Sequence, residues 1–121
     1  MKTKEDKLKL LEETAQFYNT GNRSVIRISC RYFLPNKPGC AIGRLIADKK
    51  LCRKLDVFSD GSSVRAVFSY LPEDLKNYGV NFLEMLQELH DRESNWTETG
   101  LSALGLRHVE KMKADIEEGV I

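Results

Sequence analysis

Apolar residues recur every three or four positions over most of this chain, and this helical period constrains its fold more than any other feature. Near the start, residues 3–19 predict an amphipathic helix with a charged outer face. Its apolar positions include Leu8, Leu11, Ala15 and Tyr18. Thr3 and Asp6 form a weak capping box at one end, and Gly21 is a candidate left-handed stop at the other.

The last fifty residues show the same period. We expect C-terminal helices over residues 72–118, with Pro72 at a first helical position and Gly119 just beyond the last helix. The apolar face of these helices would hold Phe82, Met85, Leu86, Leu89, Leu106, Val109, Met112 and Ile116. Residues 95–98 predict a further helix cap around Trp96, which we interpret as a core anchor.

One segment has a different period. From Ser24 to Leu34, apolar and polar residues alternate, which is typical of a strand. One face of the strand would hold Ile26, Ile28, Cys30, Tyr32 and Leu34, and the other Arg27, Ser29 and Arg31. This alternation puts Cys30 on the buried face as an inert thiol. Residues 35–39 contain two prolines and would end the strand in a loop.

The middle of the chain is less regular. Residues 40–55 return to helical spacing, so that a strand, a loop and a helix would occupy 24–55, with a break in the helix near residues 47–48. Residues 57–70 predict a hairpin or a second strand, with a turn at the Asp-Gly pair of positions 60–61.

A chain of 121 residues is about the usual size of one domain. Together with the element pattern, this length predicts an α+β fold: one mostly helical domain over residues 1–121 with a small antiparallel sheet of two or three strands. Such a sheet needs helices over one face to be stable.

The charge is balanced. Lys and Arg total 19 against 18 Asp and Glu, which leaves a net charge of +1. A balanced chain lacks the excess field that usually indicates a nucleic-acid or membrane-surface protein, although a local basic patch is still compatible with it. No apolar run approaches the roughly 20 residues that span a bilayer. We therefore expect a cytoplasmic protein with no membrane contact, and the balanced charge argues against nucleic acid as its partner.

The three cysteines, Cys30, Cys40 and Cys52, predict reduced thiols and no metal site, because they are ten and twelve residues apart with no neighbouring histidine. Nothing indicates a cofactor. Cys40 lies where a loop is expected to enter a helix, and helix N-termini favour the thiolate. With His90 as its base, Cys40 could be the nucleophile of a Cys-dependent hydrolase or transferase. The simpler interpretation is a small core residue, with Gly43 allowing close packing against the strand.

A second candidate is an anion-binding site. Arg27 and Arg31 would share one strand face, beside the free amides of the helix expected to begin near Gly39, with Arg44 adding charge. Guanidinium groups and backbone amides both suit phosphate. The alternative interpretation is that Arg27 and Arg31 only make this strand face soluble in water. A nucleic-acid binder would instead use Lys49, Lys50, Arg53 and Lys54.

Several short motifs occur in a characteristic succession. They are Gly39-Cys40-Ala41-Ile42-Gly43-Arg44, Leu71-Pro72, Leu89-His90-Asp91, Asn95-Trp96 and Gly100-Leu101-Ser102. Over about residues 24–112 this succession resembles a group of small uncharacterised proteins of phages, prophages and bacteria. The resemblance implies a small accessory protein of phage origin inside a cell, and it assigns no activity.

These observations predict a non-enzymatic accessory or binding protein. Its partner would be a host or phage protein, a second copy of the chain, or a small anionic, phosphate-bearing ligand. A homo-oligomer would use apolar residues on uncovered strand faces, and we expect these to be Val25, Phe33 and Val67.

Overall fold

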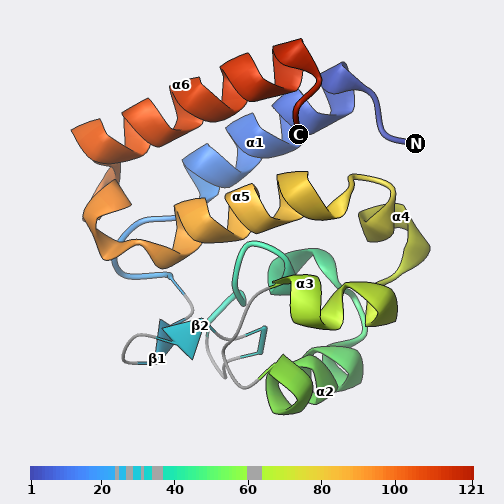
Figure 1. Ribbon diagram of the computed structural model, residues 1–121. Helices are drawn as coiled ribbons and strands as arrows, with labels where there is room; N and C mark the ends of the chain where they lie inside the picture. The colour runs from blue at the N-terminus through green and yellow to red at the C-terminus, as the bar shows by residue number, and fades with distance from the viewer. Residues whose placement is uncertain (24, 27–28, 31, 34–36, 60–63) are drawn as a thin grey trace.

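The computed structural model of the chain describes residues 1–23, 25–26, 29–30, 32–33, 37–59 and 64–121. Within these residues the fold is α+β and mostly helical, with six α-helices and two small antiparallel hairpins (Figure 1). The predicted fold class is confirmed. The elements form two layers on either side of one central helix.

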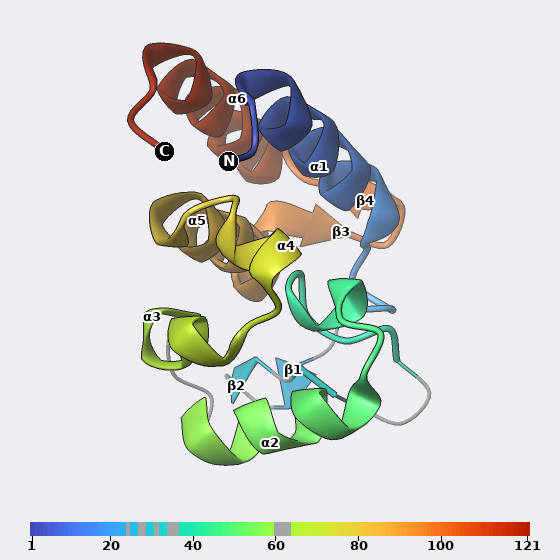
Figure 2. The same cartoon turned by 90° about the vertical axis from the view of Figure 1, so that its right-hand side faces the viewer.

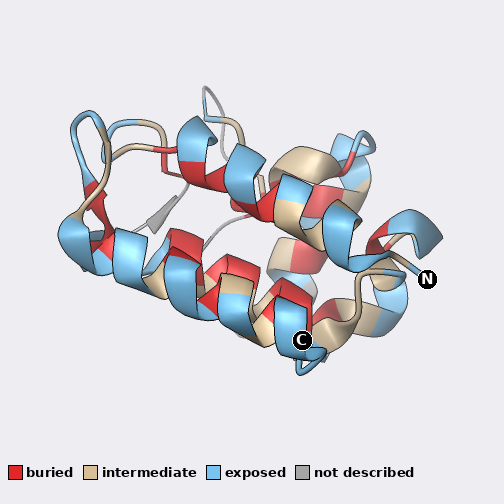
Figure 3. Cartoon of the chain, turned by 90° about the horizontal axis from the view of Figure 1, so that it is seen from above, coloured by how far each residue is buried: buried red, intermediate tan, exposed pale blue. Residues whose placement is uncertain are grey.

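The first layer contains the two ends of the chain. Helix α1 (Lys4–Phe17) and helix α6 (Ala103–Glu118) lie side by side on helix α5 (Val80–Asp91), and all three pairs of helices are in contact (Figures 1 and 2). Figure 3 looks down on α1 and α6 and shows their buried residues on the inward sides. The side chains of Leu11, Met112 and Ile116 are fully buried there. Burial of each such side chain stabilises the fold by about 1.5–3 kcal/mol.

The second layer lies on the opposite side of α5 (Figure 2). It contains a hairpin of β1 (Val25–Ile26) and β2 (Ser29–Cys30), a short 3-10 helix η1 (Gly43–Leu45) and helix α2 (Lys49–Ser59). Helix α3 (Val64–Val67), the 3-10 helix η2 (Phe68–Tyr70) and helix α4 (Glu73–Lys76) then lead into α5. Because α5 is covered from two sides, its buried residues extend around the helix and include a glutamine and a histidine.

The predicted N-terminal helix over 3–19 is confirmed at its start. Thr3 is the N-cap, and its hydroxyl accepts from the Asp6 amide while the Asp6 carboxylate accepts from the Thr3 amide, which completes a capping box. The predicted stop is wrong. The helix ends at Phe17 with extended backbone at Tyr18, and Gly21 is not among the glycines with positive φ.

The single strand predicted over residues 24–34 is wrong. Strands β1 and β2 pair with each other antiparallel, with Val25 opposite Cys30, so this stretch reverses direction within itself. Arg27, Ile28, Arg31 and Leu34 lie outside the described residues. The structure describes no side chain for Cys30, so its predicted burial stays a prediction.

The hairpin or strand predicted over residues 57–70 is also wrong in the part of this range that is described, and the turn predicted at residues 60–61 lies outside the described residues. Helix α2 extends to Ser59, and the chain is helical again from Val64 to Tyr70. Val64 and Val67 are buried one helical turn apart, whereas Ala66 between them is exposed. Burial therefore follows the helical period and not the period of two. Val67 belongs to the core, so it cannot contribute to the apolar oligomer surface that we expected.

The C-terminal region is helical as predicted, with exceptions. Pro72 is the N-cap of α4, so the first helical residue is Glu73 and not Pro72. Residues 95–98 do not cap a helix: Trp96–Thr97 (β3) pairs with Gly100–Leu101 (β4) in a second hairpin. Ser102 caps α6, and Gly119 ends it in the left-handed region at φ 76°. Leu106 is 53% exposed and lies off the buried face of α6.

Candidate functional site

The C-terminus of α5 is held by a buried arginine that the sequence pattern did not single out. Arg23 is 6% exposed, and its guanidinium donates to the carbonyl oxygens of His90 at 2.7 Å and Asp91 at 2.6 Å. The indole of Trp96 donates to the carbonyl oxygens of Leu89 and His90, at 3.0 and 3.2 Å. These donors, with the Asn95 side-chain amide that also donates to Leu89, satisfy carbonyls of the last turn that have no partner within the helix. Trp96 is thus the core anchor that we predicted.

His90 is one member of the predicted catalytic pair, and it lies in the core. Its side chain is fully buried, and the Tyr18 ring meets it edge-on with centroids 4.7 Å apart. Its Nδ1 lies 2.9 Å from the Asp91 carboxylate, which also accepts from the Gln87 amide at 2.9 Å. Burial lowers the pKa of His90, an effect that the hydrogen bond to Asp91 opposes in part. The neutral imidazole is therefore the favoured form.

Cys40, the other member of the pair, is also fully buried. Its Sγ accepts from the amide of Gly43 at 3.4 Å, and the Tyr18 hydroxyl donates to the adjacent Gly39 carbonyl at 2.8 Å. The thiol of Cys52, equally buried, donates to the carbonyl of Gly43 at 3.6 Å, and burial raises its pKa. A nucleophile must meet its substrate, so these fully covered thiols do not support the Cys40–His90 enzyme hypothesis.

The predicted anion site is not assembled by the described residues. Gly39 is buried, and the segment after it forms only the three-residue η1, so no α-helix begins there. Arg44 faces α1 instead: it pairs with Glu13 at 2.9 Å, donates to the Thr14 hydroxyl at 3.1 Å and lies over the Phe17 ring. Arg27 and Arg31 cannot be placed, because both lie outside the described residues.

Helix α2 presents a different set of cations. Four exposed basic side chains project from it within six positions: Lys49, Lys50, Arg53 and Lys54. We call this set the basic face. The apolar side of α2 is turned inward, with Cys52 and Leu55 fully buried. Val57, 78% exposed, lies one turn beyond Arg53 on the outward side.

The two carboxylates that flank the basic face in sequence accept hydrogen bonds from backbone amides. Asp56, the acidic residue of α2, accepts from the amides of Tyr32 at 2.8 Å and Phe33 at 3.1 Å. Asp48 accepts from the amides of Lys50 and Leu51 at the start of the helix. Neither carboxylate lies within ion-pair distance of the basic face among the described residues. The four cations and the two carboxylates together leave a local charge of +2 for a partner.

Two members of the basic face have further contacts. The Lys49 ammonium donates to the carbonyl oxygens of Ile46 at 2.8 Å and Gly43 at 3.4 Å. The Arg53 guanidinium lies 4.5 Å from the centre of the Phe33 ring. Both contacts position a cation without neutralising it.

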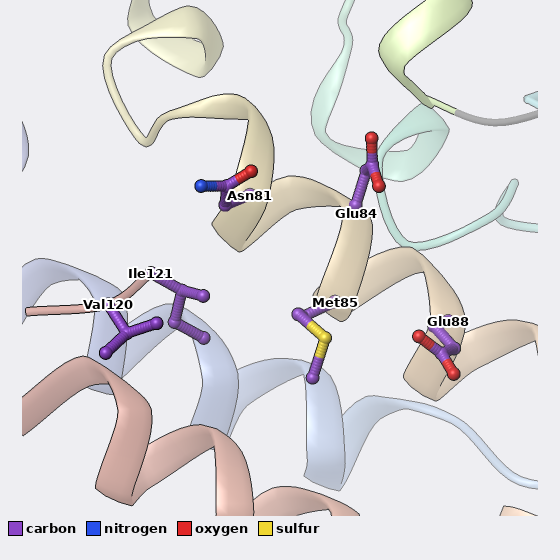
Figure 4. Close-up of a pocket in the computed structure, with 6 residues that line it drawn as sticks. All are labelled: Asn81, Glu84, Met85, Glu88, Val120 and Ile121. Atoms are coloured by element: carbon purple, nitrogen blue, oxygen red, sulfur yellow. The ribbon is translucent and has the colours of Figure 1, made fainter.

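A surface pocket of about 290 Å³ lies between α5 and the C-terminal tail (Figure 4). Met85, Val120 and Ile121 supply apolar lining, and Glu84 and Glu88 lie along α5 beside it. Both carboxylates are already paired, Glu84 with Arg65 and Glu88 with Arg92. The pocket therefore has no free charge that would select a ligand.

Neither a metal site nor a membrane span is found in the described part of the chain. Its His, Cys, Asp and Glu residues form no group of three or more that could hold a metal ion. Its helices include none long and apolar enough to cross a bilayer.

Comparison of the chain with protein-family models, with curated proteins and with solved structures gives no match in any of the three. The resemblance to small proteins of phages, prophages and bacteria therefore stays a prediction. So do the expected cytoplasmic location and the expected homo-oligomer.

Proposed function

We propose that this protein is a non-enzymatic accessory protein that binds an anionic partner through the basic face of α2. One observation supports this most directly: four exposed cations project from one helix, while Asp48 and Asp56, which flank them in sequence, accept from backbone amides and form no ion pair with them among the residues described. This proposal keeps the anionic ligand that the sequence led us to expect. It moves the binding site from the segment of Gly39 and Arg44 to helix α2.

Within the residues that the structure describes, the basic face groups four cations without a recorded ion pair on one helix, whereas Lys9 and Arg107, which also have none, lie apart on α1 and α6. Elsewhere, several basic residues have an acidic partner within 4 Å. These pairs are Arg44–Glu13, Arg65–Glu84, Arg92–Glu88, Lys111–Asp115 and Lys113–Glu12. Among the described residues, no such ion pair is recorded for any member of the basic face.

The net charge of +1 does not oppose this proposal. Charges that lie further apart than the Debye length, about 8 Å at physiological salt, are largely screened from each other. A partner at α2 therefore responds to the local charge of the basic face more than to the sum over the chain.

Charge reversal tests the proposal. Lys50→Glu/Lys54→Glu lowers the charge of the basic face by four units and keeps good helix formers at both positions. Lys9→Glu/Arg107→Glu, at exposed sites on α1 and α6, changes the net charge equally and serves as the matched control. On a heparin column, the wild-type protein and the control should elute at higher salt than the α2 variant. Elution of the two variants at the same salt concentration would reject the basic face as the binding surface.

A further inference from the structure

The geometry of α2 sets the charge density that a partner must match. At about 100° and 1.5 Å per residue, the four cations fall within an arc of roughly 140° and about 8 Å of helix axis. The pairs Lys49/Arg53 and Lys50/Lys54 are each four residues apart, a spacing at which like charges destabilise an isolated helix. An anionic partner would relieve this repulsion.

A nucleic-acid backbone has the required charge density. Duplex DNA presents one negative charge per roughly 1.7 Å of its axis, so several phosphates fall within the length of the basic face. The close spacing of the cations on α2 therefore matches the spacing of phosphates along a duplex.

The composition of the basic face favours the same partner. Protein–protein interfaces have apolar cores in which Lys is depleted, whereas protein–DNA interfaces are more polar and strongly positive. Among the α2 residues whose side chains are described, Val57 is the one exposed large apolar residue. A single exposed valine does not make an apolar core for a protein interface.

The side-chain types indicate how nucleic acid would be contacted. Three of the four cations are lysines, whose ammonium groups act as point charges toward phosphates and lack the planar, rigid fork of arginine. The guanidinium of Arg53 is stacked over the Phe33 ring. We propose, on the basis of the function proposed above, that the anionic partner is the phosphodiester backbone of duplex nucleic acid, bound without preference for base sequence.

This proposal predicts the salt dependence of binding. Each neutralised phosphate contributes about −0.9 to the slope of log K against log salt, so three or four contacts give about −2.7 to −3.6. Affinity should then fall roughly 40- to 150-fold between about 50 and 200 mM salt. Loss of two lysines should reduce the steepness of the slope by about 1.8.

The experiment uses fluorescence anisotropy with the full chain. The probes are two labelled DNA duplexes of equal length and unrelated sequence, and a labelled poly-glutamate peptide of similar total charge. The proteins are the wild type, Lys50→Gln/Lys54→Gln, and the control Lys9→Gln/Arg107→Gln, each shown by its thermal melt to be folded. We expect the wild type and the control to bind both duplexes within threefold of each other and more tightly than the peptide. The α2 variant should bind them at least tenfold more weakly, with the shallower slope.

The outcomes separate the two proposals. Binding of poly-glutamate in preference to DNA, lost in the α2 variant, would overturn the nucleic-acid inference and leave the anionic-partner function standing. A preference of more than tenfold between the two duplexes would overturn sequence-independent binding. Failure of the wild type to bind any probe at low salt, or equal binding by both variants, would overturn the inference and the function together.

Discussion

Gly43→Ala tests how α2 is seated in the fold. A Cβ at position 43 would lie 2.3 Å from the carbonyl oxygen of Tyr32 and 2.7 Å from its Cα. Tyr32 cannot move easily, because its ring is 2% exposed and its amide donates to Asp56 on α2. Gly43 in turn accepts from the Cys52 thiol, so the contact joins three segments around the base of α2. Gly43 thus packs closely as expected from the sequence, but against Tyr32, which lies after β2 and not in a strand.

Two opposing effects decide how much Gly43→Ala changes the free energy of unfolding. Replacing Gly with Ala at a compatible position stabilises a protein by about 0.4–1 kcal/mol, because the unfolded chain loses freedom. Overpacking costs about 1–3 kcal/mol, and a clash with backbone atoms belongs at or above the upper end of this range. We expect Gly43→Ala to lower the free energy of unfolding by about 2 kcal/mol or more.

Urea unfolding, followed by the fluorescence of the single tryptophan Trp96, measures this loss. With an m-value of about 2 kcal/mol/M, the midpoint should fall by about 1 M. Gly21→Ala is the control, because its Cβ would meet only the Asn19 side-chain oxygen, at 3.3 Å. That variant should stay within about 0.5 kcal/mol of the wild type. A Gly43→Ala midpoint equal to or above that of the wild type would refute the account of the contact.

Three further predictions concern the core. Burial lowers the pKa of His90 and His108, so the unfolded chain binds more protons than the folded one below about pH 6.5. The free energy of unfolding should therefore fall as the pH decreases from about 7 to 5. In His90→Gln, the urea midpoint should fall less over this pH range than in the wild type. A pH profile identical to that of the wild type would contradict the role of His90. Cys40 and Cys52 should react with a thiol reagent only as fast as the chain opens, and rapid labelling of Cys40 in the folded protein would revive the nucleophile hypothesis. Trp96→Phe removes an indole N–H that donates to the carbonyls of Leu89 and His90, which keep Asn95 and Arg23 as donors. This substitution should cost about 0.5–1.5 kcal/mol by circular dichroism in urea; stability equal to that of the wild type would contradict this role.

Local signals in the sequence predicted the helices near both ends of the chain. The capping box of Thr3 and Asp6, and the stop at Gly119, involve only residues within one or two turns of each other. Such features form wherever the local sequence occurs, so the pattern alone is sufficient. The apolar faces of α1, α5 and α6 were predictable for the same reason.

The errors arose where tertiary packing outweighed a local pattern. Residues 64–70 have alternating apolar residues, yet Val64 and Val67 pack as a helix, and α3 contacts both α2 and α5. The start of the 39–46 segment has the local features of an exposed helix N-terminus. Its burial at Cys40 depends on residues distant in sequence, such as Tyr18. No local signal contains that information.

The basic face shows the same division between sequence and structure. Lys49, Lys50, Arg53 and Lys54 are visible as a cluster in the sequence, and their helical spacing predicts that they share a face. Whether the cations of such a cluster form ion pairs depends on which groups the neighbouring carboxylates contact. Asp56 accepts from amides 23 and 24 residues earlier in the chain. The sequence by itself therefore determined where the helices near both ends begin or stop and which cations lie together, because those properties follow from neighbours within a few turns. Only the tertiary structure decided which charges and thiols are accessible, because covering or neutralising a group requires contact between segments that the sequence places far apart.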